Sequence, residues 1–133
     1  MAGAGNPPNP YGIKTDYFWK RLFTPRGFSR VIENYAQITE ERNPKTGRKK
    51  EKQIFPRFHQ LEVVRRLLAD VAWNGVGKRY LIQHSAGSGK SNSIAWLAHQ
   101  PIGLRKDGNE IFDSIIVVTD RRILDQQIHA SDL

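Results

Sequence analysis

Cysteine is absent from the sequence, which excludes disulfide bonds, thiolate metal ligands and cysteine nucleophiles and fits a reducing compartment. No apolar run approaches the roughly 18 residues that a membrane-spanning helix needs. The first residues, MAGAGNPPNPYG, lack the basic and apolar stretches of a signal peptide. The four histidines have no spacing typical of metal ligands. These absences predict a cytoplasmic protein with no membrane partner.

Acidic residues are scarce as well. The 133 residues include 13 Asp and Glu against 21 Lys and Arg, which leaves a formal net charge of +8. This balance favours a polyanionic partner such as nucleic acid, although basic proteins of other kinds share it. The hydrophobic content of 38% is ordinary for one globular domain.

The N-terminal part divides into two segments. Residues 1–14 are rich in Pro, Gly and Asn and are predicted to form a linker or disordered arm. Residues 15–55 are predicted to hold two short helices, in TDYFWKRLF and FSRVIENYAQI, followed by the basic stretch ITEERNPKTGRKKEKQIF. The turn signal NPKTG favours a solvated hairpin or mobile loop over a nucleic-acid contact for this basic stretch.

From residue 56 onward, helical and strand patterns alternate. One stripe of apolar residues at helical spacing predicts a helix that ends near Asn74 and Gly75; its members are Leu61, Val64, Leu68 and Val71. RYLIQ (79–83) and SIIVVT (114–119) are predicted strands that flank the helix KSNSIAWLAHQ, and another helix is predicted over 121–133. The order strand, helix, strand predicts parallel pairing and an α/β fold.

Between the first strand and its helix lies the glycine-rich loop HSAGSGKS. Such a loop directs backbone N–H groups and the positive end of the helix dipole at one small volume, which suits phosphate. Lys90 is expected to reach the β and γ phosphates of ATP, and Ser91 to bind the Mg²⁺, so both are the predicted catalytic residues. The other expected contacts of the loop with ATP are Ser85, Ala86, Gly87, Ser88, Gly89 and Asn92.

The loop departs from the strict phosphate-loop pattern at one position. His84 replaces the first glycine of G-x-x-x-x-G-K-[ST]. The strand before the loop and the helix after it favour phosphate binding over a merely flexible glycine loop. At this junction a histidine satisfied by backbone hydrogen bonds is a better interpretation of His84 than a catalytic base.

Three segments together resemble the R subunit of type I restriction enzymes: FPRFHQLEVVRRLL, HSAGSGKSNSIAWLAHQ and IIVVTDRRILDQQI. The resemblance implies a superfamily 2 motor, with residues 56–133 as the first RecA-like P-loop lobe, in incomplete form. The activity implied is that of a type I site-specific deoxyribonuclease with an ATP-driven DNA translocase. The implied partners are duplex DNA and the methylation and specificity subunits, and the implied cofactors are ATP and Mg²⁺.

The resemblance also assigns residues outside the loop. Gln60 occupies the adenine-reading position, with Arg57 and Phe58 beside it in the nucleotide site; the alternatives are a solvent-facing glutamine and a core phenylalanine. The segment DRRILDQQI matches a nucleic-acid-contact motif, which assigns that role to Arg121, Arg122 and Gln127. A capped, solvated helix start is the alternative for the two arginines, although cations oppose the helix dipole there.

Several parts of the family pattern are missing. No acidic pair for the metal follows within the sequence, Asp120 is a poor substitute for it, and the nuclease carboxylates are not found upstream. We therefore expect a chain truncated on both sides that binds ATP weakly and is inactive alone.

Two other functions fit part of the sequence. A nucleoside or nucleotide kinase would use Asp120 of VVTDRR as a base for a substrate hydroxyl. A non-catalytic basic docking or DNA-binding module would carry the phosphate loop as a vestige.

Overall fold

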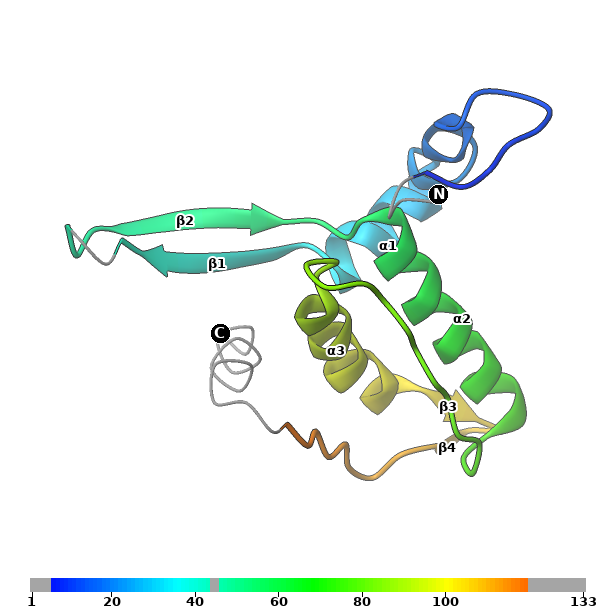
Figure 1. The fold of residues 1–133 in the computed structure, drawn as a ribbon. Coiled ribbons are helices and arrows are strands. Elements are labelled where there is room, and N and C mark those ends of the chain that lie inside the picture. The colour runs from blue at the N-terminus through cyan, green and yellow to red at the C-terminus, as the bar shows by residue number, and fades with distance from the viewer. Residues whose placement is uncertain (1–5, 44–45, 120–133) are drawn as a thin grey trace.

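The computed structural model describes residues 6–43 and 46–119, apart from the side chain of Glu41. Within them a helical N-terminal segment leads into a long β-hairpin, and two helices then pack together around the core (Figure 1). The observed architecture is a small mixed α/β fold with two antiparallel hairpins. No described helix has the length and apolar composition to cross a membrane.

The N-terminal segment contains a π-helical turn, Phe18–Leu22, and helix α1, Pro25–Asn34. The α1 helix begins where the Thr24 hydroxyl accepts a hydrogen bond from the Gly27 N–H and Pro25 supplies a fixed φ in the first turn. The predicted pair of helices is therefore confirmed. The second helix begins and ends earlier than FSRVIENYAQI suggested: it starts at Pro25, after the Thr24 cap, and stops at Asn34, because Tyr35 is buried in the core and Gln37 already belongs to a strand.

The basic stretch forms the hairpin that the turn signal predicted. Strand β1, Gln37–Arg42, pairs antiparallel with β2, Lys49–Ile54, in a register that sets Gln37 opposite Ile54. The hairpin projects away from the helices (Figure 1). Only its base reaches the core, where Ile54 packs against the buried cluster.

Helices α2, Phe58–Asn74, and α3, Lys90–His99, form the body of the fold. The predicted apolar stripe is confirmed as the inner face of α2, since Leu61, Val64 and Val71 are buried and Leu68 is half-buried. Trp96 of α3 is 1% exposed and shares a cluster with Tyr35, Leu61 and Val64. The α3 helix ends at His99, and the 3-10 turn Gln100–Gly103 contains the predicted terminator, Pro101.

The parallel RecA-like sheet expected from the sequence is not seen in the described residues. Neither 79–83 nor 114–119 forms a strand, and the two segments follow separate paths (Figure 1). The second hairpin is instead a short antiparallel pair, β3, Arg105–Lys106, with β4, Asn109–Glu110. A strand needs a hydrogen-bonded neighbour, and these apolar runs lack one: Leu81 is 94% exposed and Ile116 is 84% exposed. The apolar pattern alone therefore gave the wrong sheet.

Replacement of the central tryptophan tests this core. Trp96→Ala removes a fully buried ring and its indole N–H bond to the Tyr35 carbonyl (3.1 Å), and we expect it to lower the free energy of unfolding by about 3–5 kcal/mol. Urea unfolding followed by circular dichroism measures the loss. The matched control is Trp73→Ala, because Trp73 is 82% exposed. Equal losses for the two variants would contradict the core described above.

Candidate functional site: the loop before α3

The predicted phosphate loop leads directly into α3. Gly87 has φ 72° and Gly89 has φ 80°, values in the left-handed region that favours glycine. Gly89 is also the N-cap residue of α3, so the free N–H groups of the first helical turn lie immediately beyond it. The loop thus has the local geometry that anion binding at a helix N-terminus requires.

Lys90 lies over the loop from the first position of α3. Its Nζ donates hydrogen bonds to the carbonyl oxygens of Ser85 (2.8 Å) and His84 (3.2 Å), and the residue is exposed. Ser91 and Asn92 follow in the same turn and are half-buried. The Lys90 amine thus folds back onto the loop that precedes α3. An ammonium group and the N–H groups of a helix N-terminus form a donor set that fits a phosphate.

Gln60 connects α2 to this loop. The side chain is 2% exposed, and its Nε2 donates to the carbonyl oxygens of Gly89 (2.8 Å) and Ser88 (3.3 Å). Its Oε1 accepts a hydrogen bond from the Arg57 N–H at the start of α2 (2.8 Å). The solvent-facing alternative for Gln60 is therefore wrong, because the amide is buried and holds two loop carbonyls.

Two histidines meet behind the loop. The His59 ring lies edge-on to the His84 ring at 5.0 Å between centroids, and His59 Nε2 lies 3.0 Å from the Ser88 carbonyl oxygen. Among the described residues, the Nδ1 atoms of both rings and the Ser88 hydroxyl are buried without a hydrogen-bond partner. Sequence reasoning missed His59, because only the tertiary fold places this α2 residue against the loop.

Arg57 and Phe58 lie at the start of α2, near a hollow of about 250 Å³. The Phe58 ring contacts the Tyr17 ring at a centroid distance of 4.9 Å, and the exposed Arg57 also lines the hollow. Tyr17 comes from the N-terminal segment, far away in sequence, and no motif indicated it. The structure therefore places Phe58 in an aromatic cluster close to the buried Gln60.

Comparison with known proteins gives one family. The family model described as SWI2/SNF2 ATPase matches residues 59–132, which is more than half of the chain. The chain belongs to the SWI2/SNF2 ATPase family. No curated protein and no solved structure matches it.

Membership of the SWI2/SNF2 ATPase family makes this an ATPase-related chain from a family that acts on DNA. The match covers both Gln60 and the loop, as well as the segment DRRILDQQI. The family match indicates neither a restriction subunit nor a nuclease activity. All three predicted nucleic-acid contacts lie outside the described residues: Arg121, Arg122 and Gln127. Asp120 lies outside them as well.

Two glycine replacements separate backbone strain from contact with Gln60. Gly87→Ala and Gly89→Ala both force alanine into the left-handed region, at a cost of about 1–2 kcal/mol. A Cβ on Gly87 meets nothing within 4 Å, whereas a Cβ on Gly89 collides with the Gln60 Nε2. Because that amide cannot move without losing its loop bonds, we expect Gly89→Ala to lower the melting temperature clearly more than Gly87→Ala. Equal shifts would contradict the role of Gln60 as a support of the loop.

The His84 side chain makes stability depend on pH. Burial lowers the pKa of His84, and the nearby charges of His59 and Lys90 lower it further. Below the ordinary histidine pKa of about 6.5, the unfolded chain binds the proton more tightly than the folded chain does. The neutral His84 ring therefore contributes to the free energy of unfolding. This contribution is complete above about pH 6.5, the ordinary histidine pKa, and is lost as the pH falls through the pKa of the folded chain. Unfolding measured between neutral and mildly acidic pH is expected to show a shallower pH dependence for His84→Asn than for the wild type; an unchanged slope would argue against this.

Proposed function

We propose that this chain is the nucleotide-binding part of an ATP-driven DNA translocase, the motor of a type I restriction enzyme R subunit. The observation that carries the proposal is the loop at the N-terminus of α3, which Gln60 supports and Lys90 covers, within a SWI2/SNF2 ATPase match. The restriction assignment depends on the three sequence segments named above and goes beyond the family match.

The residues of the loop divide the binding task between them. The N–H groups of the first turn of α3, directly after Gly89, would bind the phosphate oxygens, aided by the dipole of α3. Lys90 would exchange its bonds to the Ser85 and His84 carbonyls for the β and γ phosphates, and the Ser91 hydroxyl would bind the Mg²⁺. When bound, ATP with Mg²⁺ supplies the phosphoryl bond whose hydrolysis drives the motor.

The adenine end of the nucleotide is assigned to the start of α2. Arg57 and Phe58 line the aromatic hollow there, and Gln60 lies one helical turn from Arg57. Gln60 would read adenine only by giving up a bond to the Ser88 or Gly89 carbonyl. This exchange would couple recognition of the base to the conformation of the phosphate loop.

DNA is assigned to the segment that follows the second apolar run. Arg121, Arg122 and Gln127 would contact the phosphate backbone of a duplex, consistent with the net charge of +8. The methylation and specificity subunits remain the proposed protein partners. Turnover by these 133 residues alone is expected to be negligible, because the acidic pair that positions water and metal is not among them.

Thermal melting with Mg-ATP tests the nucleotide site. At 100 times its Kd a ligand stabilises the folded state by about 2.7 kcal/mol, which raises the melting temperature of a domain of this size by roughly ten degrees. We expect that shift for the wild type and for Lys50→Ala, an exposed lysine of β2, and no shift for Lys90→Ala. No shift in any variant would contradict nucleotide binding.

DNA binding provides the second arm of this experiment. A motor predicts that Mg-ATP and Lys90→Ala both change the affinity for duplex DNA. Salt-sensitive DNA binding that neither of them alters would instead favour a basic binding module with a vestigial loop.

A further inference from the structure

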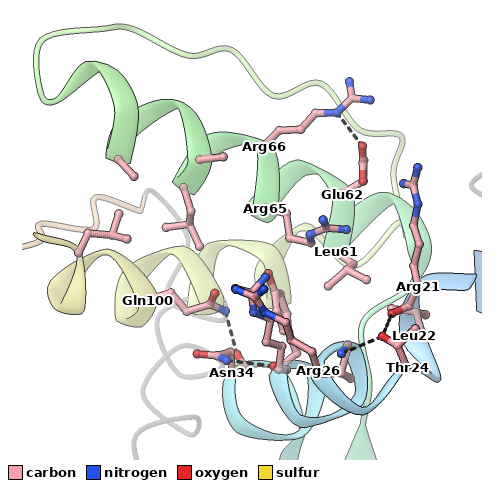
Figure 2. A pocket seen from close by; sticks show the side chains of 18 residues that line it. Arg21, Leu22, Thr24, Arg26, Asn34, Leu61, Glu62, Arg65, Arg66 and Gln100 are labelled. Atoms are coloured by element: carbon pink, nitrogen blue, oxygen red, sulfur yellow. Dashed lines mark hydrogen bonds and ion pairs between the residues drawn. The ribbon is translucent and has the colours of Figure 1, made fainter. Parts of the chain in front are cut away.

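A second concave surface lies away from the phosphate loop. It is a groove of about 840 Å³ between α1 and α2 that reaches the turn after α3, and none of its lining residues belongs to the loop (Figure 2). Figure 2 shows α1 on one side and α2 on the other, with Gln100 of the turn after α3 donating to the Asn34 carbonyl (2.8 Å) between them. We call this surface the arginine groove.

Five arginines line the arginine groove, and they come from three elements: Arg21, Arg26, Arg30, Arg65 and Arg66. The one carboxylate in the lining, Glu62, is already paired with Arg66 (2.7 Å). In the part of the chain that the structure describes, the other four guanidinium groups make no hydrogen bond or ion pair. Four exposed cations thus line one groove without a counter-charge from the described residues, and an anionic partner would find free guanidinium groups there.

The electrostatic environment of Tyr35 agrees with this positive field. Burial raises the pKa of the Tyr35 phenol, and the charges of Arg65 and Arg30 oppose that rise. Tyr35 itself forms part of the groove lining. The arginines therefore act on the floor of the groove as well as on its rim.

The floor of the groove is apolar. Leu22, Val31, Leu61 and Leu68 line it together with two alanines of α2. A phosphate backbone makes no favourable contact with such a floor. An amphipathic segment, by contrast, buries apolar side chains in it and places carboxylates on the rim. The lining also contains no lysine, although the chain has several. Protein interfaces are enriched in arginine and depleted of lysine, while phosphate contacts use both.

We propose that the arginine groove docks an acidic amphipathic helix of a partner protein. Apolar side chains on one face of that helix would enter the floor, and Asp or Glu residues beside them would pair with Arg26 and Arg30 of α1 and with Arg65 of α2. Arginine forms two parallel hydrogen bonds with a carboxylate, which fixes the orientation of the helix. A second copy of this chain is a poor occupant, because each copy carries a charge of +8. The inference does not depend on the proposed motor function: no residue of the nucleotide loop takes part, and only Leu22 and Leu61 also line the hollow assigned to adenine.

A library of displayed helical peptides, each about four turns long, tests this proposal. Its members carry leucine on one face, and the flanking positions vary among Glu, Gln and Lys. The groove variant combines Arg26→Glu with Arg65→Glu, one from each wall. The control combines Arg48→Glu with Arg79→Glu, which are exposed arginines outside the groove and give the same change in net charge. Circular dichroism verifies that both variants fold.

We expect selection on the wild type and on the control to enrich Glu at the flanking positions. The selected peptide should bind the groove variant at least about tenfold more weakly, and added salt should weaken its binding to the wild type. Absence of Glu enrichment, or equal binding by the groove variant, would overturn the proposal. Displacement of the peptide by a short DNA duplex would assign the groove to nucleic acid, and self-association abolished in the groove variant would assign it to a second copy; both results would overturn it as well.

Discussion

The packing of Trp96 into the cluster of Tyr35, Leu61 and Val64 holds the described fold together. The indole ring belongs to α3, the two aliphatic side chains belong to α2, and Tyr35 lies between α1 and the hairpin. The bond from the indole N–H to the Tyr35 carbonyl satisfies a polar group that would otherwise be buried without a partner. One side chain thus joins α2, α3 and the segment between α1 and the hairpin in a single cluster. The loop before α3 and the groove beside α1 both take their positions from it.

The phosphate loop depends on this packing through a second contact. Because α3 is fixed against α2, His59 and Gln60, which precede Leu61 of the cluster, reach the Ser88 and Gly89 carbonyls. While these bonds are made, the Ser88 and Gly89 carbonyls are held toward α2 and away from an anion, which their negative ends would repel. Residues of α2 that hold the loop carbonyls thereby leave the N–H groups of the first turn of α3 as the groups that face an anion. The support of the loop is consequently as much a part of the site as Lys90.

The loop and the arginine groove differ in the chemistry they offer. The loop presents backbone N–H groups and one amine, a set suited to a compact polyanion. The arginine groove presents guanidinium groups around an apolar floor, a set suited to a folded segment with mixed character. Both use positive charge, yet neither shares a residue with the other. The basic residues that produce the net charge of +8 are thus divided between at least two separate surfaces.

The sequence by itself determined the features that depend only on neighbours along the chain. The apolar stripe of α2, the hairpin turn, the capped start of α1 and the glycine loop before α3 all follow from residues within a turn or two of one another. The predicted strands failed because an apolar run becomes a strand only beside a partner, and neither 79–83 nor 114–119 has one among the described residues. Tertiary structure alone decided that Gln60 is buried against the loop, that Tyr17 meets Phe58, and that arginines of three elements share one groove. These contacts join residues that are far apart in sequence and that the core around Trp96 brings together, so no local pattern could encode them.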